Sequence, residues 1–325
     1  MSNSIVSKLV VDSESLTEEK VSSLFKKMDL FVPSEMMGTN ITKGKKKKFS
    51  ETTFYLGILR EIASHKPFTL GVEDGANWLT VKKSNIHTFV TINLTGELFN
   101  QNKDRIFRFI EDAFSELSGI VAFACSSEDD FWQNNTDPDF YRLRNKSIEG
   151  VRLKQCPIIK GRQIVDIEYN PGHSHFIGDV WFGSCWAMWF GKGFFRYIPN
   201  QMLSDYNNCF ENKTLASDSI RILLYEDVFD YGNLQSRDKQ WFFRKNVGID
   251  EIAHSLMKEP IKQQDPTVEI ETLEKLPNGK GMKVTYYYGK SGELVPKSKA
   301  TTFKSYELDV SGNTISYVES KSGGQ

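Results

Sequence analysis

The sequence predicts an α+β protein with a largely antiparallel sheet, a few packed helices and a C-terminal antiparallel β-meander. Two observations support this class: single helical segments interrupt runs of strands, and the last sixty or so residues alternate polar and apolar side chains between glycine-containing turns. The chain has 325 residues and a hydrophobic content of 39%. That is enough for a sizeable core in one large or two ordinary domains.

The first third of the chain changes from helical to strand periodicity. A capping-box pattern at Ser15–Glu18 predicts a helix over 18–28, and a second apolar stripe predicts one over 52–64. Beyond Pro67 the apolar period falls to two residues, which is typical of strands. The predicted strands are 68–73, 78–81 and 88–94, followed by a helix over 103–117 and a strand over 120–125 that is buried on both faces.

The middle of the chain is predicted to be rich in strands. Residues 126–141 form a loop in this prediction, and 250–258 form a short helix that stops at Pro260. The predicted strands are 150–153, 163–169 and 219–225, with a tryptophan- and glycine-rich region over 176–198.

The tryptophan-rich region is predicted to be the centre of the core. Its apolar run, 180–190, is about eleven residues long, whereas a membrane span needs roughly twenty. We therefore expect Trp186 or Trp189, or both, to be buried. Gly183 and Gly191 should let neighbouring strands pack or turn closely.

The C-terminal meander is predicted from strict alternation. Residues 282–288 and 305–310 alternate in polarity, with turns at 277–279, 289–292 and 311–313. The polar stretch 262–266 is the best boundary candidate. The predicted domains are therefore an α+β domain over 1–262 and a small antiparallel meander over 263–325, appended to the first sheet or extending it.

Composition limits the classes of function and the compartment. The 41 basic and 42 acidic residues nearly cancel, so no whole-molecule field favours nucleic acid or a membrane. The four cysteines are widely spaced, which predicts free thiols in a reducing compartment. The N-terminus shows no secretory pattern, and we expect a cytoplasmic protein without a cofactor.

The paired histidines His173 and His175 form an alternative polar site. Alternate residues of a strand point the same way, so both rings could face one metal ion, completed by Asp179 or Cys185. No further ligand has a known metal spacing, and no nucleophile is tied to either ring. We expect a polar turn and no metal site, and a hydrolase or metal-dependent enzyme that uses this pair remains the alternative.

A basic run offers a second alternative. Lys45, Lys46, Lys47 and Lys48 make a compact positive patch that could touch a phosphate backbone, as in a component of a bacterial defence complex. The run has no interleaved aromatic residues on which bases stack. We expect a solvated loop.

Two acidic and aromatic segments are the strongest functional lead. The first, 126–141, contains Glu128, Asp129, Asp130, Phe131 and Trp132, and lacks lysine and arginine. The second, 225–231, contains Glu226 and Asp227. Aromatic anchors surrounded by charges of one sign give interfaces both affinity and fast association. One alternative is an ordinary acidic loop whose aromatic side chains are tucked into the core. The other, which we pursue, is one surface that binds a basic protein, with Trp132 as its anchor and the acids of 128–130 as steering charges.

The region from Phe68 to Glu226 resembles bacterial polymorphic-toxin immunity proteins. The resemblance lies in the order of strands, helix, buried strand, acidic-aromatic segment and tryptophan-rich region, which ends in Phe195-Arg-Tyr-Ile-Pro199. It covers about half of the chain. It implies a cytosolic, non-catalytic protein that binds and neutralises a cognate toxin, and it assigns no role to any single residue.

Overall fold

The computed structural model describes residues 3–85, 87–257, 267–276, 279–309 and 314–321. The chain divides into two compact units: residues 1–134 with 171–257, and residues 135–170 with 258–325. The predicted boundary stretch 262–266 lies outside the described residues, and the predicted division at 262 stays a prediction. In the structure, residues 135–170 belong to the same compact unit as the C-terminal sheet, whereas the predicted division placed them in the first domain.

The first unit is built on a ten-stranded sheet in the order β13-β14-β12-β7-β1-β6-β5-β4-β2-β3. Every neighbouring pair is antiparallel, which confirms the predicted α+β class. The strands are β1 (Ser4–Val11), β2 (Glu35–Gly38), β3 (Lys47–Lys48), β4 (Phe68–Glu73), β5 (Trp78–Lys83), β6 (Thr88–Thr95), β7 (Gly119–Ser126), β12 (Ala187–Phe190), β13 (Glu211–Thr214) and β14 (Ile220–Leu223). A separate hairpin joins β10 (Ser174–Ile177) to β11 (Val180–Gly183).

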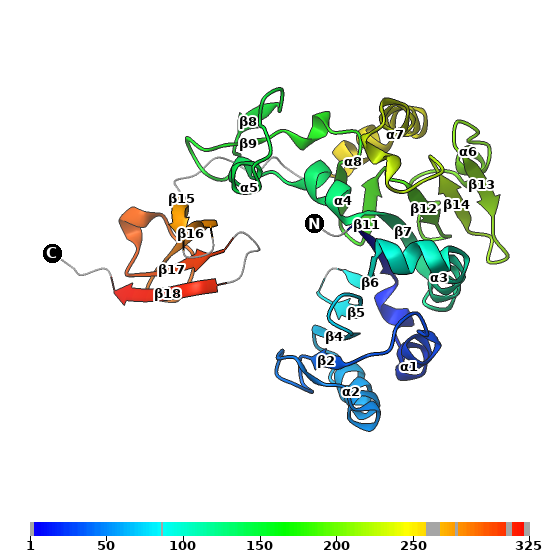
Figure 1. Ribbon diagram of the computed structural model, residues 1–325, viewed down its shortest axis with the longest axis horizontal. Coiled ribbons are helices and arrows are strands. Elements are labelled where there is room, and N and C mark those ends of the chain that lie inside the picture. Colours follow the sequence, from blue (N-terminus) through cyan, green and yellow to red (C-terminus); the bar gives the residue numbers. More distant parts are fainter. Residues whose placement is uncertain (1–2, 86, 258–266, 277–278, 310–313, 322–325) are drawn as a thin grey trace. The chain divides into compact units, whose positions relative to one another are not determined.

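Helices pack around this sheet (Figure 1). The longest, α3, packs on β7, β1 and β6, and α8 packs on the β10–β11 hairpin. No helix among the described residues is both long enough and apolar enough to cross a membrane. The helices of this unit are α1 (Glu18–Lys27), α2 (Glu51–Ala63), α3 (Gly96–Glu116), α4 (Ser127–Asn134), α6 (Asn200–Ser204), α7 (Leu234–Val247) and α8 (Ile249–Leu256), with a 3₁₀ turn η3 (Asp230–Gly232) before α7.

The tryptophan-rich region is the centre of the core, as predicted. Trp186 and Trp189 are both fully buried, and the Phe107 ring stacks on Trp186 at 5.6 Å between centroids. A Cβ at Gly191 would lie 2.1 Å from the Gly119 carbonyl oxygen. Only a glycine therefore allows this close approach of two backbones.

The segment 126–141 corrects the sequence prediction, because it is largely helical and not a loop. Helix α4 covers its first half, and α5 (Pro138–Leu143) begins within its second half. Asp137 caps α5 by accepting a hydrogen bond from the Asp139 backbone N–H, and Pro138 occupies the first turn, where a missing N–H costs nothing.

The second unit holds the predicted meander, a four-stranded antiparallel sheet in the order β15-β16-β17-β18. Met282 and Val284 on β16 form a small core with Leu143 of α5. The predicted turns at 277–279 and 311–313 include residues outside the described ranges. The strands are β15 (Val268–Leu276), β16 (Gly279–Tyr288), β17 (Thr302–Leu308) and β18 (Thr314–Lys321), with a small hairpin of β8 (Leu153–Gln155) and β9 (Gln163–Val165).

Candidate functional site

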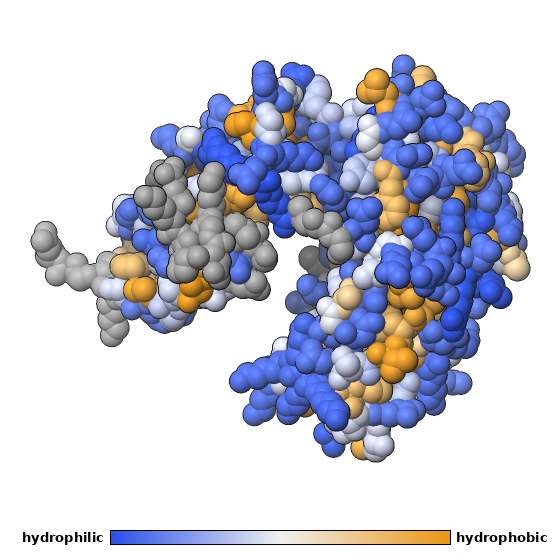
Figure 2. All heavy atoms as spheres, in the orientation of Figure 1, coloured by the Kyte–Doolittle hydropathy of each residue, from blue (hydrophilic) through white to orange (hydrophobic). Residues whose placement is uncertain are grey.

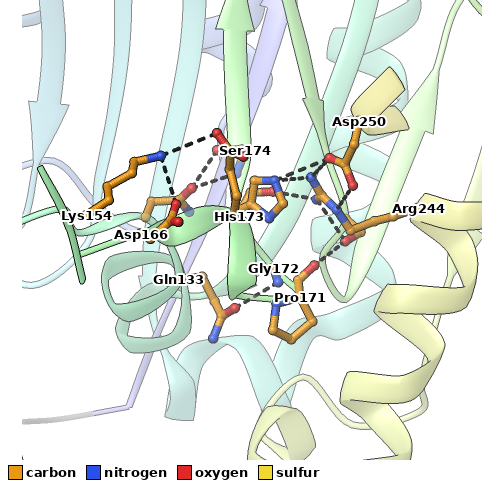
Figure 3. A network of polar contacts seen from close by, with 12 residues as sticks. Gln133, Lys154, Asp166, Pro171, Gly172, His173, Ser174, Arg244 and Asp250 are labelled. Carbon is orange, nitrogen blue, oxygen red and sulfur yellow. Dashed lines mark hydrogen bonds and ion pairs between the residues drawn. The ribbon is translucent and has the colours of Figure 1, made fainter. Parts of the chain in front are cut away.

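A buried guanidinium holds the polar centre of the first unit (Figure 3). Arg244 projects from α7, is 1% exposed, and donates from Nη1 to the His173 carbonyl oxygen at 2.6 Å. Its Nε donates to Asp250 of α8 at 3.1 Å. Its Nη2 lies 2.5 Å from Nε2 of His173. Because a guanidinium can only donate, the His173 Nε2 accepts this bond, and its 3.3 Å contact with Asp250 is a close approach rather than a second hydrogen bond.

Further buried polar groups extend this network. Nη1 of Arg244 also reaches the Ser184 hydroxyl at 3.3 Å, and that hydroxyl donates to the Pro171 carbonyl at 2.7 Å. Gln240, one turn before Arg244 on α7, donates to the Ser184 carbonyl at 3.3 Å. The network joins α7 and α8 to the chain on both sides of the β10–β11 hairpin.

The pKa shifts of Arg244 and Asp250 are those of an ion pair. Burial raises the pKa of Asp250, but the hydrogen bonds and the positive charge of Arg244 outweigh burial and hold that pKa well below its ordinary value. Burial lowers the pKa of Arg244, and its bond to Asp250 opposes that effect. Arginine nevertheless stays protonated in proteins. The site is therefore an ion pair between a buried guanidinium and a carboxylate whose side chain is 27% exposed.

The structure brings His173 and His175 together, with ring centroids 5.0 Å apart. Asp179 and Cys185 do not complete the set: Asp179 pairs with Arg196, and the Cys185 thiol contacts the carbonyls of Ala124 and Ala187. The third member is Asp250, whose carboxylate lies with one nitrogen of each ring inside a 4.8 Å cluster.

These donors do not fit a metal ion as they are arranged. The candidate ligand atoms lie within 4.8 Å of one another, but the Arg244 guanidinium already bonds both His173 and Asp250 where a metal ion would have to bind. The cation of this site is the arginine itself.

His175 is poorly suited to be a general base. Burial lowers its pKa to about 4, with a further contribution from the positive charge of Arg244. Its Nε2 is buried and has no hydrogen-bond partner among the residues that the structure describes, and its ring lies 5.7 Å from that of His254. A base that is so weak at neutral pH contributes little to proton transfer.

The structure places most of the first acidic-aromatic segment in the interior. Trp132, the predicted anchor, is 6% exposed, and its ring packs edge-on against Phe131. Asp129 is 2% exposed and forms a two-pronged ion pair with Arg237 of α7. Burial raises the pKa of Asp130. Glu128 is half-buried, and its carboxylate accepts hydrogen bonds from Trp132 and Tyr231 but forms no ion pair in the described part of the chain.

The two acidic segments are nevertheless neighbours. The Tyr231 hydroxyl donates to Glu128 at 3.4 Å, and the Arg237–Asp129 pair joins α7 to α4. Glu226, Asp227 and Asp230 are exposed on the connection between β14 and α7. None of these three, nor Glu128, forms an ion pair with a lysine or arginine among the described residues. We call Glu128, Glu226, Asp227 and Asp230 the acidic surface.

The basic run lies elsewhere in this unit. Lys45, Lys46, Lys47 and Lys48 are exposed, and Lys47 and Lys48 form the edge strand β3 that pairs with β2. Lys46 forms an ion pair with Glu73 of β4. Charged side chains on an edge strand protect it from pairing with another chain, which accounts for this run without a nucleic acid.

Comparison with known proteins gives no family. No family model matches the sequence, and no curated protein matches it. Among solved structures, the Pseudomonas aeruginosa T6SS protein PA0821 is similar at 9% identity and a TM-score of 0.44, over 76% of each chain. A chain from the structure of the toxic C-terminal tip of CdiA from Pseudomonas aeruginosa in complex with its immune protein matches at 13% identity and a TM-score of 0.26, over 39% of this chain and 88% of that one. Neither likeness is close enough to say what this chain binds.

Proposed function

We propose that this chain is a non-catalytic protein-binding module that captures a basic protein through the acidic surface. The observation that carries the proposal is a contrast between neighbouring acids. Asp129 is neutralised by Arg237, whereas Glu226, Asp227 and Asp230 are exposed without a cationic partner in the described ranges. Acids held together in this way repel one another, and a basic partner relieves that repulsion on binding.

Within this class, we favour an immunity-type protein that neutralises a cognate toxin. A toxin that acts on nucleic acid needs a basic surface to hold phosphates. An acidic surface on this chain would be complementary to it, would speed its capture and would cover the toxin's substrate-binding face. The resemblance of residues 68–226 to immunity proteins points to the same class.

The test is capture followed by kinetics. The full chain, tagged at one end, would be used to capture partners from its source cells, and association and dissociation rates would be measured with the captured protein. A variant with Glu226→Gln, Asp227→Asn and Asp230→Asn should associate about tenfold more slowly at low salt. Its dissociation rate should change much less.

The matched control removes three exposed acids elsewhere on the same unit: Glu19→Gln, Glu51→Gln and Asp104→Asn. Its net charge changes by the same amount, yet its association rate should stay within about twofold of the parent rate. Capture of no basic protein, or an equal slowing by both variants, would count against the proposal.

A further inference from the structure

Helix α7 carries polar and apolar side chains on both its inward and its outward face. A surface helix normally turns apolar side chains inward and polar ones outward. On α7 the inward face includes Ser236, Gln240 and Arg244, which are 4%, 0% and 1% exposed. The outward face carries Leu234, Trp241 and Phe242, which are 80%, 37% and 52% exposed.

The inward polar residues have a structural reason. Arg244 and Gln240 belong to the buried network around His173 and Ser184, where their hydrogen bonds compensate for lost hydration. Phe243 and Val247 give the same face its apolar contacts with the core. The interior of the unit therefore accounts for this face completely.

The outward apolar residues are used only in part within the unit: the Trp241 ring lies 6.4 Å from that of His173, whereas Leu234 and Phe242 are 80% and 52% exposed. Leu234 and Trp241 are seven positions apart, which is two helical turns, so they lie on one side of α7, and Phe242 adjoins Trp241. Hydrophobic atoms reach the surface in the area of α7 (Figures 1 and 2). Exposed tryptophan and phenylalanine on one helix face are typical of protein interfaces and of their energetic centres.

This apolar face lies next to the acidic surface. Helix α7 begins directly after η3, whose Asp230 belongs to the acidic surface, and Arg237 of α7 packs over the Tyr231 ring at 5.6 Å. Asp238 is exposed between Leu234 and Trp241 on the same side of the helix. The exposed cation on this side is Lys245, one turn beyond Trp241. The side nearest Leu234 is thus an apolar centre with an acidic margin.

We infer that the outward face of α7, formed by Leu234, Trp241 and Phe242, is the anchor of the binding surface, and that its partner presents apolar side chains among lysines and arginines. This inference rests on the proposed function and moves the predicted aromatic anchor from the buried Trp132 to the exposed Trp241. Charge complementarity selects the occupant. A second copy of this chain would bring two acidic margins together, which like-charge repulsion disfavours.

The test uses three synthetic helical peptides and the full-length chain. One peptide repeats leucine and lysine, one replaces its leucines by serine, and one replaces its lysines by glutamate. The leucine–lysine peptide should bind most tightly, as measured by calorimetry and by protection of tryptophan fluorescence from acrylamide. The fluorescence is read in a Trp78→Phe background, because Trp78 is half-buried; Trp241 is then the relevant reporter, since Trp132, Trp181, Trp186 and Trp189 are buried.

Leu234→Ala and Trp241→Ala should each weaken binding of that peptide at least fivefold and leave the serine–lysine peptide unaffected. Leu234 is 80% exposed, so its replacement should not alter folding even if that of Trp241 does. The matched control is Leu56→Ala on α2, where an exposed leucine (53%) lies on a different helix. It should bind every peptide as the parent does.

The outcomes separate this inference from the proposed function. If the acidic-surface variant weakens binding of the lysine peptides but the α7 variants do not, the anchor assignment is wrong and the acidic capture surface stands. Equal binding of the leucine and serine peptides, or no binding by any peptide, also overturns the anchor. A dimer in light scattering that Leu234→Ala dissociates would show that a second copy occupies the face instead.

Discussion

Arg244 is the most consequential residue in the polar centre, because its contacts determine which chemical role His173 and His175 can have. Taken alone, His173-Ser-His175 suggests a metal ligand pair or a general base. With Arg244 bonded to both His173 and Asp250, the same atoms form an ion pair. The sequence could not reveal this, because Arg244 and Asp250 lie some seventy residues further along the chain and have no spacing that links them to the histidines.

His175 leads to a prediction about pH. Its folded-state pKa is about 4, below the ordinary value near 6.5, so the unfolded chain binds a proton between those values and the folded chain does not. The contribution of the neutral ring to the free energy of unfolding is fully present above about pH 6.5 and is lost as the pH falls toward 4. After allowance for partial exposure, the loss should be on the order of 1–2 kcal/mol. Asp250, with its depressed pKa, loses its contribution only at lower pH.

Urea unfolding at pH 7.5, 6.5, 5.5 and 4.5 measures this slope. His175→Gln removes the titrating ring next to His173, Arg244, Asp250 and His254, so its free energy of unfolding should fall less over that range. His65→Asn is the control, since His65 is exposed and has a positive φ that asparagine tolerates. A slope that His175→Gln leaves unchanged would contradict the assignment.

At the scale of elements, periodicity predicted most of the first unit. The strands at 68–73, 78–81 and 88–94, the buried strand at 120–125 and the helix at 103–117 all correspond to observed elements. The N-terminal β1 was missed although it lies at the centre of the sheet, because its alternation in Ser-Ile-Val-Ser-Lys-Leu-Val-Val breaks down where both faces become buried. Helix α7 was missed because both of its faces mix polar and apolar residues, which removes the apolar stripe that periodicity detects.

The candidate binding site was predictable only in part. Composition drew attention to 126–141 and 225–231, and the structure does bring these segments together through Glu128 and Tyr231. Composition could not show which aromatic side chains face outward. Trp132 faces the interior, and the exposed Trp241 lies in a helix that the pattern did not indicate.

The ion pair of Arg244 with Asp250 should stabilise the packing of α7 against α8. Arg244→Met leaves the Asp250 carboxylate and the His173 carbonyl without their donor, so the free energy of unfolding should fall by about 3 kcal/mol. Adding Asp250→Asn to that variant should recover part of the loss, because the unpaired charge is then gone. Chemical denaturation of the three proteins measures both effects.

The control for Arg244 is an exposed pair. Lys192 and Asp218 form an ion pair in which both side chains are about three-quarters exposed, so Lys192→Met should change stability by less than about 0.5 kcal/mol. Wild-type stability in Arg244→Met would mean that the network contributes nothing to holding the helices, and the histidines would again be open to another role.

At the scale of the whole molecule, basic and acidic residues are nearly equal in number but are not evenly distributed over the surface. The chain has 41 basic and 42 acidic residues, and many of its surface charges are paired, as Lys27 is with Glu116 and Arg105 with Asp29. The acidic surface groups Glu226, Asp227 and Asp230 on one connection, where none has a cationic partner among the described residues. A nearly neutral protein with a local acidic surface avoids a strong general field while it attracts a basic partner at one place.

Salt dependence distinguishes this local attraction from an effect of net charge. The association rate with the captured basic partner should fall steeply between about 20 mM and 500 mM salt, because the screening length shrinks from about 20 Å to a few ångströms. The variant with Glu226→Gln, Asp227→Asn and Asp230→Asn should show a much flatter dependence, with rates that converge on those of the parent at high salt. The control variant with Glu19→Gln, Glu51→Gln and Asp104→Asn has the same net charge and should follow the parent at every salt concentration. If instead the two variants give the same flattened dependence, overall charge steers the partner and the acidic surface does not.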